Sequence, residues 1–230
     1  MDTHLDLATV AALIGNPARA AMLSDLLSGS ALTATELAAR AEIAPSTASE
    51  HLARLVDGRL IAVEAQGRHR YYRLASNDVA RLLEALGAYA PVTPPDHARH
   101  VPADLRFART CYDHLAGHLG VAIRDALVAR GHIAEAGAEH TVTASGDRWF
   151  ATFGIDLETA RASRRSFARR CLDWSERRPH LAGALGAALL RRMLERDWLV
   201  QVPGERQVIL TPDGQHGLAR DLGIVIPPDL

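Results

Sequence analysis

The hydrophobic and polar positions near the start of the chain predict three short helices. Apolar residues recur at helical spacing through residues 7–27, and the sequence GNP at residues 15–17 divides them into two helices. Thr33 followed by Glu36 matches a capping box, in which the side chain of each residue accepts a hydrogen bond from the backbone N–H of the other. We therefore expect a third helix that begins after Thr33 and ends near Ala41.

A fourth helix is expected after a short turn at residues 42–44. Pro45 suits the first turn of that helix, because a proline there loses no hydrogen bond. Two short helices joined by such a turn form a helix-turn-helix, whose second helix can lie in the DNA major groove. The outward positions of the second helix hold polar side chains that suit contacts with phosphates or base edges. They are Ser46, Thr47, Ser49, Glu50, His51 and Arg54.

Residues 60–75 alternate between apolar and polar positions around Gly67, which predicts a β-hairpin. Its tip carries Arg68, His69 and Arg70, and a wing beside a recognition helix needs such charges to contact DNA phosphates. The whole chain has a formal net charge of -1, so the prediction of DNA binding depends on this local basic patch. A solvated hairpin with incidental charge is the alternative interpretation.

Three stretches of the chain, LIGNPARAAMLSDLL, TATELAARAEIAPSTASEHLARLVDGRLI and GRHRYYRL, occur in the order and spacing of a known family. Through them, residues 9–89 resemble the ArsR-type winged helix regulators. The resemblance implies a homodimer that binds a double-stranded DNA operator, usually as a repressor that an inducer releases.

The chain departs from that family at two places where metal-sensing relatives bind their ions. Some relatives carry a cysteine pair where this chain has Glu-Leu-Ala-Ala at residues 36–39. Others place His and Asp ligands on the helix after the wing, where this chain has Asp78 and Glu84 but no histidine. We therefore expect any effector to bind beyond residue 90.

Residues 92–105 contain three prolines and little periodicity, which is typical of a linker. This segment predicts a division of the chain into two domains. Residues 1–91 would form the winged helix-turn-helix domain, and residues 106–230 would form a sensor or dimerisation domain.

The predicted second domain contains a repeated phrase, HLAGHLGVAI from His114 and HLAGALGAAL from His180. The similarity continues beyond the phrase and predicts two repeats at about 106–156 and 167–226, each with a helix, a hairpin and a short helix. The predicted fold is mainly α with small β-hairpin wings (α+β), an N-terminal winged helix-turn-helix followed by two winged-helix-like repeats. The first helices of the two repeats are expected at residues 114–130 and 180–196.

The two cysteines of the chain, Cys111 and Cys171, each lie shortly before one copy of the phrase. On a helix that runs from about Phe107, Cys111, His114 and His118 would share one face and could supply most of a zinc-type site. If the repeats pack about a pseudo-twofold axis, both sets of residues could meet in one cavity. The candidate effector residues are Cys111, His114, His118, Cys171, Asp173, Trp174, Arg177 and His180.

Three interpretations of these residues remain open. The cysteines and histidines can be buried core residues, since cysteine is among the most buried residue types. They can instead form a soft-metal sensor, so that a soft divalent metal is the candidate cofactor. The third interpretation is a thiol switch, or a pocket for a small organic molecule lined by Trp174, Arg177 and His180.

Composition limits the class and location of the protein. No segment has the roughly 18 consecutive apolar residues of a membrane span, and the start MDTHLDLATV lacks the basic region of a signal peptide. We expect a cytoplasmic protein with no membrane partner and with reduced thiols at rest.

The leading hypothesis is a homodimeric transcriptional regulator, a repressor whose operator binding responds to a soft metal, a thiol-reactive species or a small organic molecule. One alternative is a protein-binding winged-helix module without DNA affinity. The other is an enzyme that uses Cys111 as nucleophile and His114 as base. The sequence shows no third orienting group or oxyanion loop, so we do not expect an enzyme.

Overall fold

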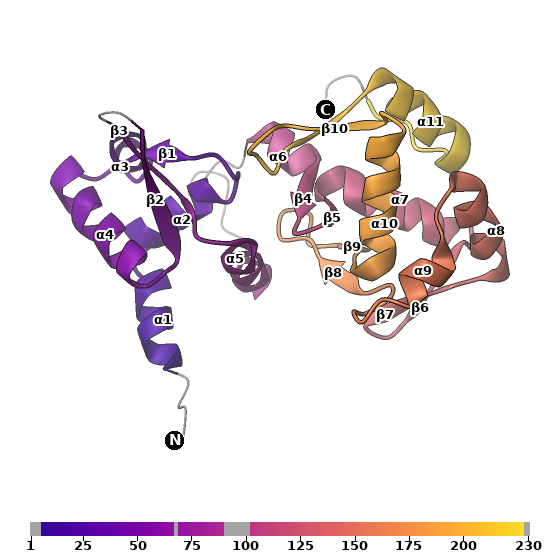
Figure 1. Cartoon of the computed structure of the whole chain (residues 1–230), viewed down its shortest axis with the longest axis horizontal. Helices are drawn as coiled ribbons and strands as arrows, with labels where there is room; N and C mark the ends of the chain where they lie inside the picture. Colours follow the sequence, from indigo (N-terminus) through magenta and orange to yellow (C-terminus); the bar gives the residue numbers. More distant parts are fainter. Residues whose placement is uncertain (1–5, 67–68, 90–101, 228–230) are drawn as a thin grey trace. The chain divides into compact units, whose positions relative to one another are not determined.

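The computed structural model describes residues 6–66, 69–89 and 102–227. They form two compact units, of which the first ends at Leu83 and the second begins at Glu84. The first unit is a winged helix-turn-helix, as predicted (Figure 1). Its elements are α1 (Leu7–Ile14), α2 (Pro17–Leu26), β1 (Leu32–Thr33), α3 (Ala34–Arg40), α4 (Pro45–Asp57), β2 (Ile61–Gln66), β3 (His69–Leu74) and the first part of α5 (Asn77–Tyr89), whose residues from Glu84 onward belong to the second unit.

The helices of the first unit begin at residues whose local sequence favours a helix start. The Asn16 side chain accepts the N–H of Arg19 and caps α2. Thr33 and Glu36 form the predicted capping box of α3. Pro45 lies in the first turn of α4, as expected.

Leucines from α3 and α4 form the centre of the first unit. Leu37, Leu52 and Leu55 are fully buried, and complete burial of one leucine contributes roughly 1.5–3 kcal/mol. The wing strands β2 and β3 pair antiparallel, and β1 pairs with β3 to complete a three-stranded sheet. This packing holds one face of α4 inside and leaves its polar face exposed.

The second unit consists of short antiparallel hairpins and helices that occur in the same order twice. Each half contains a hairpin, a helix of 13 residues, a second hairpin and another helix. Figure 1 draws the first half in pink to salmon and the second half in orange to yellow. The first half contains α6 (Ala103–Phe107), β4 (Arg109–Cys111), β5 (His114–Ala116), α7 (Gly117–Ala129), β6 (Ile133–Ala136), β7 (Glu139–Val142), α8 (Ala144–Phe153) and α9 (Leu157–Arg161). The second half contains β8 (Arg170–Leu172), β9 (Pro179–Leu181), α10 (Gly183–Glu195), β10 (Leu199–Gln201), β11 (Val208–Leu210) and α11 (Pro212–Leu222).

The helix expected from Phe107 through His118 is wrong, because the chain forms the hairpin β4–β5 there and α7 begins only at Gly117. Tyr112 in the turn has a φ of 63° and Gly117 has a φ of 81°, and both values interrupt a right-handed helix. His180 likewise lies on β9, and α10 begins after it. The predicted linker is also too long, because its last residues belong to α6; residues 92–101 lie outside the described part of the chain.

Two glycines allow the halves of the second unit to pack closely. A Cβ added to Gly120 on α7 would lie 3.7 Å from the Cβ of His180, and one added to Gly186 on α10 would lie 3.2 Å from the Cβ of His114. Each helix therefore packs against the histidine hairpin of the other half, as Figure 1 shows for α7 with β9 and α10 with β5. This crossing brings the two histidine hairpins together. None of the helices in the described residues is long and apolar enough to cross a membrane.

Candidate DNA-binding surface and metal centre

The polar face of α4 is the first candidate site. Of the six side chains predicted to point outward, five are exposed. The exception is His51, which is half-buried with its Nδ1 atom 3.3 Å from Nη1 of Arg19. Burial, together with the charge of Arg19, lowers the pKa of His51. His51 therefore points only partly outward. The exposed residues are Ser46, Thr47, Ser49, Glu50 and Arg54.

The wing, which follows α4 in the sequence, contributes basic side chains. His69 and Arg70 are exposed at the start of β3, where His69 pairs with Gln66. Arg68 lies outside the described residues. Arg73 on the same strand is exposed as well, although it was not among the predicted contact residues. It lies three residues after Arg70, so the alternation of a strand places the two side chains on opposite faces and gave no signal for Arg73.

The second candidate site is a cluster of the two cysteines and two of the histidines. Cys111 is paired with His114 across β4–β5, and Cys171 is paired with His180 across β8–β9. Cross-strand partners present their side chains side by side. Because the two hairpins meet, one ligand atom from each of these residues lies within 4.8 Å of every other.

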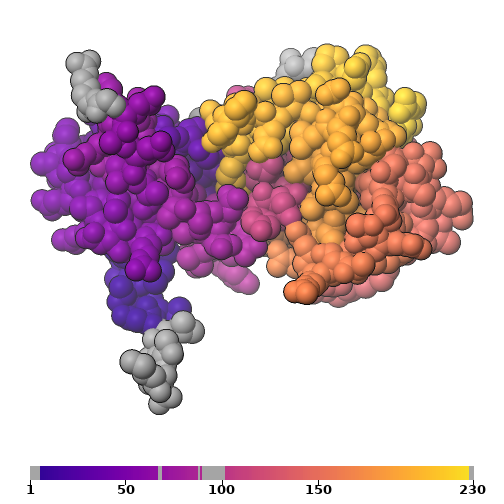
Figure 2. Space-filling model, in the orientation of Figure 1, coloured from indigo at the N-terminus to yellow at the C-terminus, as the bar shows by residue number. Residues whose placement is uncertain are grey.

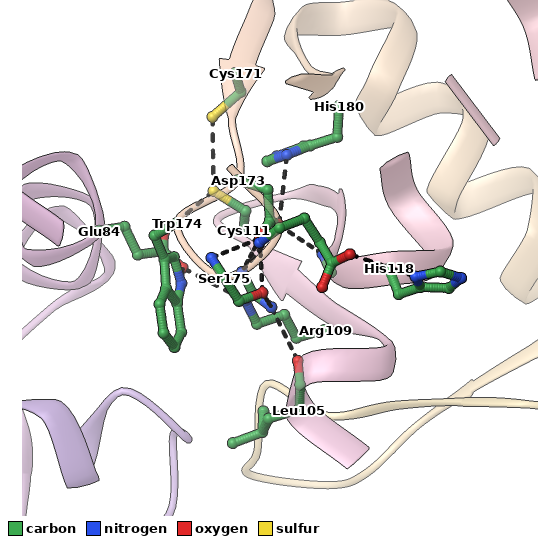
Figure 3. Close-up of polar contacts among 12 residues, drawn as sticks. Glu84, Leu105, Arg109, Cys111, His118, Cys171, Asp173, Trp174, Ser175 and His180 are labelled. Atoms are coloured by element: carbon green, nitrogen blue, oxygen red, sulfur yellow. Dashed lines mark hydrogen bonds and ion pairs between the residues drawn. The ribbon is translucent and has the colours of Figure 1, made fainter. Parts of the chain in front are cut away.

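Like residues from the two halves lie close to each other in this cluster. The Sγ atoms of Cys111 and Cys171 are 4.0 Å apart, as the dashed line in Figure 3 marks. The Nε2 atoms of His114 and His180 are 3.1 Å apart. Both histidines and Cys111 are buried, and Cys171 is partly buried. The cluster therefore presents two sulfur and two nitrogen atoms to one small region.

His118 lies outside this cluster. It is on α7, where its ring stacks on Phe107 and its Nδ1 atom is 3.3 Å from Oε2 of Glu176. Its side chain is 41% exposed, and Figure 3 shows it pointing away from the two sulfurs. The spacing that predicted one face for Cys111, His114 and His118 required a helix, and the hairpin removes that arrangement.

Two aspartates lie beside the histidine Nδ1 atoms, on the side of each ring away from the cluster. Oδ1 of Asp113 is 3.3 Å from Nδ1 of His114, and Oδ2 of Asp173 is 3.6 Å from Nδ1 of His180. Asp173 was predicted from the sequence as a site residue, whereas Asp113 was not. The signal was present, since an aspartate follows each cysteine at the second position.

Asp173 is fully buried and is held by several donors. Nη2 of Arg109 donates to both of its carboxylate oxygens at 2.9 Å, and the N–H of Gly117 donates at 2.7 Å. Ser175 completes the shell through its N–H and hydroxyl, as Figure 3 shows. Burial opposes ionisation, but Arg109 and these N–H groups outweigh it and hold the pKa of Asp173 below its ordinary value.

The two thiols differ in acidity because they interact with each other. The hydrogen bond to Cys171, together with burial, raises the pKa of Cys111 to about 12. The same hydrogen bond lowers the pKa of Cys171. Burial would lower the pKa of His114, but hydrogen bonds with Asp113 and Cys111 outweigh it and raise that pKa. Cys171 is therefore the thiol of the pair that ionises more readily.

Glu84, at the point where α5 enters the second unit, adjoins the cluster. Its Oε2 accepts a hydrogen bond from Sγ of Cys111 at 3.1 Å. Its Oε1 accepts one from Nε1 of Trp174 at 3.3 Å and another from Arg206. Trp174 therefore helps to orient Glu84. Arg177 lies in the same loop, where its N–H donates to the carbonyl of Asp173.

The chain is similar to known helix-turn-helix proteins. A family model described as a helix-turn-helix domain matches residues 14–64. Similar solved structures include HlyU from Vibrio cholerae N16961, with 29% identity over 34% of this chain and 85% of that chain and a TM-score of 0.32. Another is the homodimeric winged helix-turn-helix domain of Mb0332 from Mycobacterium bovis, a possible ArsR-family regulator, with 28% identity over 44% of this chain and all of that chain and a TM-score of 0.35.

A further relative matches almost the whole chain. It is the uncharacterized HTH-type transcriptional regulator YdfF of Bacillus subtilis (strain 168). The two sequences are 44% identical over 223 residues, which is 96% of this chain and 99% of the relative. The match therefore includes the second unit as well as the helix-turn-helix. The chain belongs to the family of HTH-type transcriptional regulators that includes YdfF.

Proposed function

We propose that this transcriptional regulator is a homodimeric repressor that inserts α4 into the major groove of its operator. The observation that carries the proposal is the exposed polar face of α4, opposite the buried Leu52 and Leu55. No side chain caps the start of α4, so its first N–H groups can donate to a phosphate. His69 and Arg70 on the wing supply further contacts to the DNA backbone.

The helix α1 supports the proposal of a dimer. It contains no buried residue, although its sequence LATVAALI is largely apolar. Figure 2 shows α1, in indigo, projecting from the first unit. Leu7 is 73% exposed and Val10 is 37% exposed. Burial of these side chains against a second copy of the chain would remove apolar surface from water, at roughly 25 cal/mol per Å².

The cysteine and histidine cluster is the proposed effector site in the second unit. A ligand there changes operator affinity only if it binds one arrangement of the dimer better than another. The helix α5 offers a covalent route for such coupling, since its residues up to Leu83 group with the first unit and Glu84 onward with the second. Glu84 in turn accepts a hydrogen bond from Cys111. A soft metal and a thiol-reactive species both suit this chemistry.

A DNA-binding experiment tests the proposed function. We expect the protein to bind a fragment from upstream of its own gene in preference to a scrambled fragment of equal length, with two protomers per site. Affinity should fall steeply between about 50 and 200 mM salt, because phosphate contacts release counterions. The measurement is fluorescence anisotropy at two salt concentrations, with analytical ultracentrifugation of the complex. Equal affinity for both fragments would contradict operator recognition and favour a protein-binding module.

A further inference from the structure

We propose that Cys111, His114, Cys171 and His180 are the four ligands of a single tetrahedral site for a thiophilic divalent ion of the Zn²⁺ type. The proposal deepens the effector part of the proposed function by naming the ligand class. Binding of the ion itself does not require that the protein bind DNA. The two can therefore be tested separately.

The distances between the ligand atoms fit such an ion. Tetrahedral zinc with Zn–S near 2.3 Å and Zn–N near 2.0–2.1 Å places its two sulfurs about 3.8 Å apart and its two nitrogens about 3.3 Å apart. The structure has 4.0 Å between the sulfurs and 3.1 Å between the Nε2 atoms. All four ligand atoms lie within 4.8 Å of one another. Sulfur and nitrogen ligands of such an ion lie about 3.6 Å apart, so side-chain shifts of up to about 1 Å would complete the coordination.

The orientation of the imidazole rings supports the same conclusion. Ring Nδ1 atoms that face a carboxylate carry the proton, which leaves the Nε2 lone pair free for a metal. Asp113 faces Nδ1 of His114, and Asp173 faces Nδ1 of His180. With both rings in this tautomer, two Nε2 lone pairs meet at 3.1 Å. A cation between them turns that repulsion into two bonds.

The Nδ1 atom of His180 gives an independent indication. Among the described residues it is buried and lacks a hydrogen-bond partner, with Oδ2 of Asp173 at 3.6 Å. A buried polar group without a partner costs free energy. A small movement of the ring toward Asp173 satisfies Nδ1 and keeps Nε2 directed at the cluster. Coordination by an ion supplies the force that would fix the ring in that position.

The ligand set indicates a closed site rather than a catalytic one. Catalytic zinc sites use three protein ligands and keep a position for water, whereas four protein ligands without water are typical of structural zinc. Here the four ligands come in pairs from the two halves of the second unit, β4–β5 and β8–β9. The bound ion therefore joins the halves to each other.

Binding of the ion exchanges protons for metal bonds. The two thiols form two metal–thiolate bonds and release two protons to water, and no electron is transferred. The proton that Cys111 donates to Oε2 of Glu84 is one of them. When the ion is bound, this hydrogen bond is lost and a coordinated sulfur lies beside the carboxylate of Glu84. The environment of Glu84 on α5 therefore differs between the metal-free and the metal-bound protein.

Titration of the reduced, metal-free protein with Co²⁺ tests the proposal, because cobalt reports its own coordination. We expect one Co²⁺ per protomer, the intense visible absorption bands of tetrahedral cobalt, and near-ultraviolet thiolate charge-transfer bands. Addition of Zn²⁺ should bleach all of these bands by displacement. Cys111→Ser and Cys171→Ser should each lose most of the charge-transfer absorption and bind at least about 100-fold more weakly. His118→Ala is the matched control and should bind like the wild type, since His118 lies outside the cluster.

A second variant tests the assignment of Asp113 as a positioning residue. Asp113→Asn should keep the tetrahedral spectrum while binding Co²⁺ about 10–100-fold more weakly, because it replaces the carboxylate acceptor of a ligand imidazole by a neutral amide, and mutation of such a partner typically costs this much. An octahedral spectrum in the wild type, or unchanged bands in both cysteine variants, would overturn the metal site. So would a disulfide in the freshly purified protein that metal does not prevent. Tetrahedral binding without any change in operator affinity would support the site and contradict only the effector role.

Discussion

Replacement of both Arg54 and Arg70 by alanine is expected to lower operator affinity about 100-fold. Both side chains are exposed, Arg54 in the last turn of α4 and Arg70 on β3 of the wing. Single arginine contacts to DNA are worth roughly 1–3 kcal/mol, so two of them account for this loss. Fluorescence anisotropy with the upstream fragment measures it. If both arginines contact phosphates, the slope of log affinity against log salt should decrease in magnitude by about 2.

A double variant elsewhere controls for the change in net charge. Arg191 and Arg220 are 70% and 69% exposed in the second unit, and each is paired with an acid on its own helix. Their joint replacement by alanine alters the net charge by the same amount and should leave operator affinity within about twofold. Equal losses in the two double variants would show that general charge, rather than the α4 and wing surface, determines binding.

Asp173→Asn is expected to destabilise the second unit by about 3–5 kcal/mol. The replacement keeps the shape of the side chain but removes the charge that pairs with Arg109, which is only 1% exposed. A buried charge left without its partner costs about this much. Because the pKa of Asp173 is lowered in the folded protein, its ionic stabilisation is present above the unfolded value near 4 and is lost as pH falls toward the folded value.

Urea unfolding followed by tryptophan fluorescence measures this change. Trp149, Trp174 and Trp198 all lie in the second unit, so the signal reports its unfolding. Asp147→Asn is the control, because its ion pair with Arg161 is about half exposed and should contribute less than about 1 kcal/mol. A loss for Asp173→Asn no greater than for this control would contradict the importance of the buried pair.

The sequence allowed the winged helix-turn-helix to be predicted almost completely, because its signals are local. The Thr33 capping box, Pro45 at the start of α4 and the alternating residues of the wing each specify an element without help from distant parts of the chain. The partial burial of His51 was not predicted, because it depends on Arg19, thirty-two positions earlier. Helical periodicity alone does not reveal such a contact.

The residues of the cysteine and histidine cluster could be predicted from the sequence, but their arrangement in space could not. Strands as short as β4 and β5, buried throughout, lack the alternation that identifies a strand. The turn between them was also hard to predict, because its positive φ is adopted by Tyr112 and not by a glycine, which would have indicated such a turn. The repeated phrase suggested that His114 and His180 could meet, and the structure places them 3.1 Å apart at Nε2. The exclusion of His118 follows from the hairpin alone.

Metal at the cysteine and histidine cluster is expected to control operator binding. Operator affinity of the reduced protein, measured by anisotropy with and without one equivalent of Zn²⁺, tests it most directly. We expect zinc to change the Kd of the wild type by about tenfold or more, within the usual range of allosteric coupling, and to leave that of the Cys111→Ser, Cys171→Ser double variant unchanged. An identical Kd for the metal-free and zinc-loaded wild type, or an equal zinc response in the double variant, would contradict the claim.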